Sequence, residues 1–146
     1  MADPLDLSGD ITLAVTGAAE RGSTVAIGYV DDDGYPALSY RGSTLVLGPQ
    51  QLAVWARKAD SGLAAAIADR PKVSLLYFDP HGPGPRMASF KGHARVDPSA
   101  DEAVWTQMPQ QERDFDPERK GVAVVIDVDR VDGWGAGGGF SMRRDA

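Results

Sequence analysis

Four strand-like segments follow one another between residues 23 and 58, and only short turns separate them. The sequence Asp-Asp-Asp-Gly at 31–34 predicts a turn between the first two segments, and Gly-Pro at 48–49 predicts a turn between the last two. Parallel strands need a crossover of a dozen or more residues, so these turns predict two antiparallel hairpins. Alternation supports the first strand, whose apolar face carries Val25, Ile27 and Tyr29.

Three helical patterns and three further strand patterns complete the chain. We expect helices over residues 5–21, 60–70 and 97–108, and strands over 72–79, 86–97 and 121–131. The apolar face of the first helix carries Leu7, Ile11, Ala14, Val15 and Ala18. Ser99 and Glu102 have capping-box spacing at the start of the third helix, and Gly92 indicates a bulge or a close approach within its strand.

This order of elements predicts the fold class. Helices do not alternate with strands, which argues against a parallel doubly wound sheet. Six or seven mostly antiparallel strands with small helices favour a barrel, formed by a single domain over residues 1–146. The glycine-rich tail over 132–146 either stays flexible or folds over a ligand or partner, and its Trp134 and Phe140 are large for a solvated tail.

Composition excludes several function classes. The net charge is −6 and no dense basic run is present, which argues against nucleic-acid binding. The chain has no cysteine, so disulfides, thiolate catalysis and cysteine-based zinc sites are absent. The acidic N-terminus does not resemble a signal peptide, and the longest apolar run is too short to span a bilayer. We therefore expect a cytoplasmic protein without a membrane segment.

Isolated motifs do not identify a catalytic centre. Gly133, Gly135 and Gly138 match a dinucleotide-binding pattern, but the chain ends before a helix and a βαβ unit could follow. His81 and His93 lie on different elements without the ligand set of a metal site, so we expect no metal. No sequence pattern pairs a serine with a histidine base, and the catalytic residues stay unknown.

Basic and hydroxyl side chains gather in two segments. Ser39 and Arg41 share a strand face, and Ser43 and Thr44 follow Gly42 directly. The second group consists of Trp55 and Arg57 on one strand face, then Lys58 and Ser61 before the helix over 60–70. Arginine with hydroxyl groups and glycine suits a phosphate, and a helix N-terminus stabilises an anion. The alternative is that both arginines lie at the surface and pair with acidic side chains.

These segments resemble a known family. The sequence over 31–43, 52–80 and 88–97 is similar to the pyridoxamine 5'-phosphate oxidase-like proteins, the FMN-binding split barrels. The resemblance implies a six-stranded antiparallel split β-barrel that forms a homodimer, with FMN in a cleft at the subunit interface. It also implies that phosphate contacts come from Arg41, Ser43, Thr44, Arg57, Lys58 and Ser61, and that the backbone at Ser39 and Trp55 flanks the flavin ring.

The chain also departs from the family pattern. Gly62 and Leu63 stand where many flavin-binding members carry a lysine, and the C-terminus lacks the substrate motif of the pyridoxamine phosphate oxidases. We therefore expect an oxidoreductase acting on another small molecule, with the deazaflavin coenzyme as the alternative cofactor. Non-catalytic binding of a flavin or tetrapyrrole is a further alternative. Aromatic residues expected near the substrate or able to donate a hydrogen bond are Tyr29, Tyr40, Trp55, Tyr77, Trp134 and Phe140.

Overall fold

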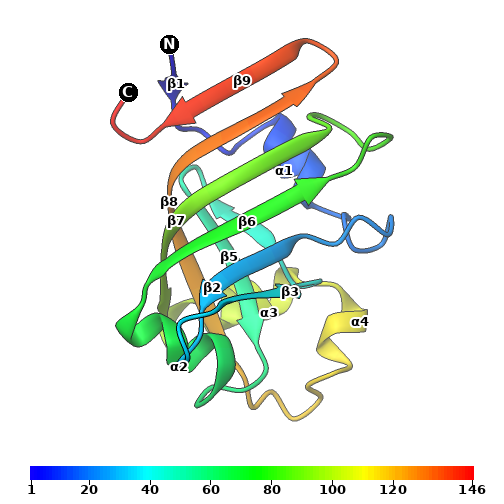
Figure 1. The fold of residues 1–146 in the computed structure, drawn as a ribbon. Coiled ribbons are helices and arrows are strands. Elements are labelled where there is room, and N and C mark those ends of the chain that lie inside the picture. Colours follow the sequence, from blue (N-terminus) through cyan, green and yellow to red (C-terminus); the bar gives the residue numbers. More distant parts are fainter.

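A computed structural model of the chain describes all of its residues, Met1–Ala146. Nine strands join in one curled sheet, with short helices around its ends (Figure 1). The strands are β1 (Asp3–Pro4), β2 (Ala26–Val30), β3 (Pro36–Tyr40), β4 (Leu45–Gly48), β5 (Gln51–Ala56), β6 (Lys72–Phe78), β7 (Met87–Val96), β8 (Val122–Gly135) and β9 (Gly138–Arg143). The helices are α1 (Asp10–Val15), α2 (Gly62–Asp69), α3 (Asp101–Gln107), α4 (Gln110–Arg113) and the 3₁₀ helix η1 (Pro98–Ala100). None of them has the length and apolar composition needed to cross a bilayer.

Strand β8 determines the architecture because it borders two different strands on one edge. Residues Val122–Asp127 pair with β5, and Arg130–Gly135 pair with β9, while β7 runs along the opposite edge. The sheet divides where β8 changes partner, and the strand order outward from β8 is β7, β6, β2 and β3. The predicted mainly β split barrel is confirmed, as are the hairpins β2–β3 and β4–β5.

The structure has nine strands rather than the six that the resemblance implied. The seven segments expected from the sequence pattern are all strands, and each end of the chain adds one more. In the tail, β8 continues to Gly135 and the chain returns as β9, whose residues pair with β8 in antiparallel register. Residues of β1 then pair with β9 in parallel. Phe140 and Met142 of β9 pack against the main core, which explains why this glycine-rich segment is ordered.

The N-terminal helix is shorter than predicted. The sequence pattern indicated residues 5–21, whereas α1 covers only Asp10–Val15. Gly9 and Gly17 both adopt positive φ, and Thr16 is extended, so the backbone leaves the helical conformation on both sides. The predicted apolar face is nonetheless buried throughout, by Leu7, Ile11, Ala14, Val15 and Ala18.

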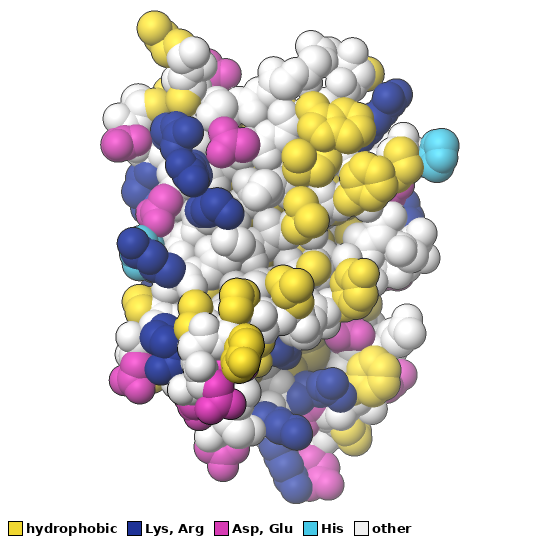
Figure 2. Space-filling view, in the orientation of Figure 1, with side chains coloured by type: hydrophobic (Ala, Val, Ile, Leu, Met, Phe, Trp, Pro, Cys, Tyr) yellow, Lys and Arg dark blue, Asp and Glu magenta, His cyan; other side chains and the backbone are white.

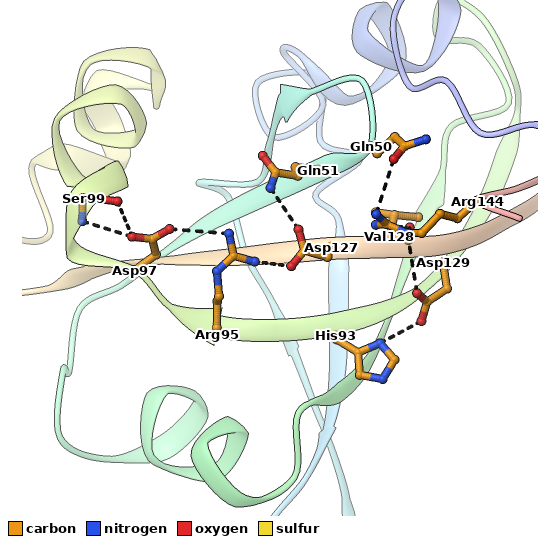
Figure 3. Close-up of polar contacts among 10 residues, drawn as sticks. All are labelled: Gln50, Gln51, His93, Arg95, Asp97, Ser99, Asp127, Val128, Asp129 and Arg144. Atoms are coloured by element: carbon orange, nitrogen blue, oxygen red, sulfur yellow. Dashed lines mark hydrogen bonds and ion pairs between the residues drawn. The ribbon is translucent and has the colours of Figure 1, made fainter.

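The capping box predicted for the third helix is also wrong. Asp97 is the N-cap of η1, and its carboxylate accepts a hydrogen bond of 3.1 Å from the backbone N–H of Ser99. An aspartate one position before Pro98 provides the acceptor that Ser99 was expected to supply. Figure 3 shows Asp97 at one end of a polar network over β7 and β8, in which Arg95 pairs with both Asp97 and Asp127. His93 and Asp129 form a second close polar contact there, with Nδ1 and Oδ2 2.8 Å apart.

Two hydrophobic clusters flank β8. The main cluster fills the barrel, and a smaller one lies between β5, β8 and α3. Val122, Val124 and Ile126 of β8 belong to the first cluster and Ala123 to the second. Strand β6 lies between β2 and β7 in the sheet. Its Leu76 and Phe78, however, are exposed, so one face of β6 borders solvent.

Candidate functional site

The turn between β3 and β4 holds Arg41 in a fixed position. The backbone N–H of Arg41 donates to the carbonyl of Val25 at 2.8 Å, which continues the β2–β3 ladder beyond β3. Its own carbonyl accepts hydrogen bonds from the backbone N–H of Thr44 at 3.1 Å and from the Thr44 hydroxyl at 2.7 Å. Thr44 is buried and closes this turn, so its side chain supports Arg41.

Ser43 connects this turn to β5. Its hydroxyl oxygen accepts a hydrogen bond of 2.9 Å from the backbone N–H of Trp55, and both residues are buried. The contact places Arg41 beside Arg57, which follows β5 directly. A small cavity of about 40 Å³ lies between them, and its lining consists of Tyr40, Arg41, Ser43, Trp55, Arg57 and Glu112.

The Arg41 guanidinium is partly buried and has no acidic partner. Its Nε donates to the hydroxyl of Ser39 at 3.1 Å, and no carboxylate lies within 4.0 Å of its nitrogen atoms. Burial lowers the pKa of Arg41, and the nearby charge of Arg57 lowers it further, whereas Tyr29 and Glu112 act in the opposite direction. The site therefore holds two arginines close together, and arginines keep their charge at neutral pH.

Arg57 extends from the cavity toward solvent. It is exposed, and its guanidinium carbon lies 5.1 Å from the ring centre of Phe115. This arrangement is a cation–π contact, which holds the side chain beside the segment that follows α4. No ion pair within 4.0 Å neutralises Arg57 either.

The structure brings together only some of the predicted site residues. Arg41, Ser43, Trp55 and Arg57 line one cavity, and Ser39 joins them through its hydrogen bond to Arg41. Lys58 and Ser61 are exposed in the connection to α2 and do not line the cavity. Ser61 is the N-cap residue of α2, but its side chain makes no capping hydrogen bond and is free for another acceptor or donor.

Glu112 was not recognisable as a site residue from its sequence context. This residue belongs to a polar connection without periodicity, and only the fold brings α4 against the turn at Gly42. A Cβ atom built on Gly42 would lie 2.7 Å from Cδ of Glu112, so the carboxylate covers this glycine directly. Gly42, which stands next to Arg41, is thus approached closely by a side chain of the same molecule.

The larger hollows of the molecule lie away from Arg41. One of about 580 Å³ lies between the N-terminal segment and the β8–β9 turn, where Phe140 contributes to its lining. Another, of about 560 Å³, lies on the outer face of the sheet, where Lys72, Lys91 and Arg130 line it. The cavity at Arg41 is too small to enclose a coenzyme, so any coenzyme held there must extend over the surface.

The aromatic residues named from the sequence divide between core and surface. Tyr77 is fully buried, and its hydroxyl accepts a hydrogen bond of 3.1 Å from Nη2 of Arg21, which gives it a structural contact. Trp134 is exposed on β8 and packs against Phe78, with ring centres 6.4 Å apart.

Exposed hydrophobic side chains gather on the outer face of the sheet. Leu38 and Tyr40 of β3 are 79% and 78% exposed, and the register places Tyr40 opposite Ala26, which in turn lies opposite Leu76. Figure 2 shows hydrophobic side chains on this face, over β3 and near the ends of β6 and β8. We call the set Leu38, Tyr40, Leu76, Phe78 and Trp134 the apolar face.

Comparisons with known proteins show where this fold occurs. No family model and no curated protein sequence matches the chain. A solved structure of a protein related to general stress protein 26, of the pyridoxinephosphate oxidase family, from Clostridium acetobutylicum matches with a TM-score of 0.62 and 11% identity. That match covers 94% of this chain and 97% of the other.

Two other solved structures with a similar fold are named for different ligands or activities. A heme-binding protein from Mycobacterium smegmatis matches with a TM-score of 0.67 and 16% identity, over 94% of this chain and 59% of that protein. A protein named F420 reductase matches with a TM-score of 0.59 and 14% identity, over 85% of this chain and 95% of the other. The chain therefore has the split-barrel fold of the pyridoxamine 5'-phosphate oxidase-like proteins.

Proposed function

We propose that this protein binds the phosphate of a flavin-type coenzyme at Arg41 and Arg57 and acts as an oxidoreductase on a small molecule. The observation that supports the proposal most directly is the unpaired guanidinium of Arg41, partly buried beside a second unpaired arginine in a protein of net charge −6. An arginine without an acidic partner in such a position is suited to an anionic ligand.

The residues around Arg41 fit a phosphate group. Two guanidinium groups supply positive charge and several N–H donors. The hydroxyl of Ser43 accepts a hydrogen bond from Trp55 and retains its own hydrogen for donation. FMN is the first candidate, and the deazaflavin coenzyme is the second because it also carries a phosphate and a protein named F420 reductase has this fold. When bound, either coenzyme would supply the hydride-transfer chemistry.

A homodimer would complete the site. The cavity at Arg41 cannot enclose a coenzyme ring, so a second surface is needed to exclude water from it. The apolar face offers such a surface, because large exposed apolar patches commonly mark interfaces. We propose that two copies associate through this face in the cytoplasm, with the coenzyme between them.

A visible absorption spectrum of the purified protein tests the proposal, with and without added FMN and followed by desalting. We expect a retained two-band flavin spectrum, and Arg41→Ala should weaken FMN binding by about 2 kcal/mol, or roughly thirtyfold in Kd. Arg86→Ala removes an equal charge from an exposed arginine that precedes β7 and serves as the control. Failure of the wild-type protein to retain FMN or a deazaflavin would contradict the proposal.

The same spectrum tests the alternative of tetrapyrrole binding without catalysis. This alternative is supported by the shared fold with the heme-binding protein from Mycobacterium smegmatis. A strong Soret band after addition of hemin, together with no flavin retention, would favour it. Sustained oxidation of a reduced nicotinamide by the flavin-loaded protein would favour the enzyme.

A further inference from the structure

The side chain of Glu112 lies directly over Gly42, in the turn beside Arg41. Distances from a Cβ atom built on Gly42 are 2.7 Å to Cδ of Glu112, 2.8 Å to Oε2 and 3.0 Å to Oε1. Both carboxylate oxygens therefore face the glycine at similar distance. Only a residue without a side chain leaves room for this approach.

The carboxylate of Glu112 has no close partner of its own. No hydrogen bond joins it to another group, and no basic nitrogen lies within 4.0 Å of it. It nevertheless lines the same cavity as Arg41 and Arg57, and its negative charge favours the charged form of Arg41. The group is thus a loosely held anion in the same cavity as two arginines that have no ion-pair partner.

The segment that carries Glu112 is anchored at both ends, by the buried Met108 before α4 and by Asp116 after it. Asp116 is buried and accepts a hydrogen bond from the indole of Trp55 at 2.9 Å. Phe115 lies under the guanidinium of Arg57. Helix α4, by contrast, has only four residues, and Glu112 is partly exposed on it. A rotation of this side chain away from Gly42 would disturb no hydrogen bond.

We infer that Glu112 is an internal anion next to the phosphate position at Arg41 and that it turns away when an anionic ligand binds. The inference rests on the proposed function, since it concerns the same two arginines. Its consequence is selectivity. An anion binds at this site only if its contacts with the arginines outweigh the repulsion from Glu112. Anions that contact the arginines weakly therefore do not bind.

Glu112→Gln tests this inference because it keeps the shape of the side chain and removes its charge. Removing a like charge at close range from a solvent-screened site should tighten binding roughly fivefold or more. The probes are inorganic phosphate, followed by the shift in thermal unfolding, and FMN, followed by quenching of its fluorescence. Glu118→Gln is the matched control, because Glu118 is exposed and pairs only with Lys120, at 3.4 Å.

The expected result is tighter binding of both probes by Glu112→Gln, no change in Glu118→Gln, and loss of the gain when Arg41→Ala is added. If the wild-type protein binds FMN through Arg41 and Glu112→Gln binds it no better, the inference on Glu112 is wrong and the proposed function stands. If Glu112→Gln gains phosphate binding through Arg41 but no variant binds a flavin or deazaflavin, the proposed function is wrong and the inference stands. Absence of binding by every variant contradicts both.

Discussion

The indole Nε1 of Trp55 donates a hydrogen bond of 2.9 Å to Oδ2 of Asp116, and this contact joins β5 to the segment that follows α4. The carboxylate of Asp116 also accepts backbone N–H groups of Lys120 at 2.9 Å and Gly121 at 2.8 Å. Burial acts to raise the pKa of Asp116, but these three hydrogen bonds outweigh it and hold the pKa below its usual value. Asp116 thereby fixes the segment that places Glu112 at the candidate site.

We expect Asp116→Asn to destabilise the protein. The amide keeps the shape but loses the charge, and one of its two terminal groups can no longer accept a hydrogen bond. Hydrogen bonds to charged groups contribute about 1.5–3 kcal/mol, so the free energy of unfolding in urea should fall by about 2 kcal/mol. Asp114→Asn is the control, because Asp114 is exposed and its side chain bonds only to Gln110. Equal unfolding midpoints for the two variants would show that the hydrogen bond between Trp55 and Asp116 does not contribute to the stability of the fold.

Stability should depend on pH in the acidic range through Asp79. The hydrogen bond of 2.9 Å from Nε of Arg21 lowers the pKa of Asp79. Because its pKa is lower in the folded state, Asp79 stabilises the fold above the unfolded pKa of about 3.9, and this contribution is lost as pH falls through the folded pKa. We expect a flat profile from about pH 7 to 5 and a decline below about 4.

Urea unfolding at several pH values between neutral and acid measures this profile. Asp79→Asn should be less stable than the wild type at neutral pH, and its stability should decline less steeply in acid. Asp116 contributes to the decline in both proteins, so a residual slope is expected. Parallel profiles for wild type and variant would contradict a role for the Arg21–Asp79 pair.

Gly92→Ala should destabilise the pairing of β7 with the bulge in β8. At the register shift between Lys91 and Gly92, Asp129 of β8 has no partner on β7, so the irregularity is a bulge of β8 opposite Gly92. A Cβ atom there would lie 2.5 Å from the carbonyl oxygen of Asp127 and 3.1 Å from Cα of Val128. Backbone atoms of a central strand cannot move aside easily, so overpacking should cost about 1–3 kcal/mol.

The midpoint of thermal unfolding, followed by circular dichroism, measures this cost. Gly137→Ala is the matched control, because a Cβ on Gly137 meets no atom within 4 Å. The control should unfold close to the wild-type temperature. Similar midpoints for all three proteins would mean that the bulge accommodates a side chain.

Leu38→Glu should convert the proposed homodimer into a monomer. Leu38 is 79% exposed in the single chain and belongs to the apolar face. A glutamate there would place a charge within the proposed interface, where it would be desolvated without a partner. Size-exclusion chromatography with light scattering measures the mass. Leu13→Glu, which alters a leucine of α1 that is 56% exposed, should leave the dimer intact. A wild-type monomer would contradict the interface.

Local sequence determined the elements whose backbone conformation depends on neighbouring residues. The turn at 31–34 and Gly48 with Pro49 specified the two hairpins, and apolar spacing identified the buried face of Leu7, Ile11 and Ala14 correctly. The pattern overestimated the length of that helix, because residues in a loop can be buried as well as residues in a helix. Arg41 and Arg57 were recognisable for the same local reason, since each follows a short strand directly.

Contacts between distant segments decided the rest. Strand β9 has little strand propensity, and it exists because β8 offers it an unpaired edge beyond the end of β5. Glu112 belongs to a connection without periodicity, and only the Trp55–Asp116 hydrogen bond and the packing of α3 bring it over Gly42. The sequence alone determined which backbone segments turn and which side chains share a face. Tertiary structure decided which edges pair and which charges meet, because those depend on the free energy of packing the whole chain.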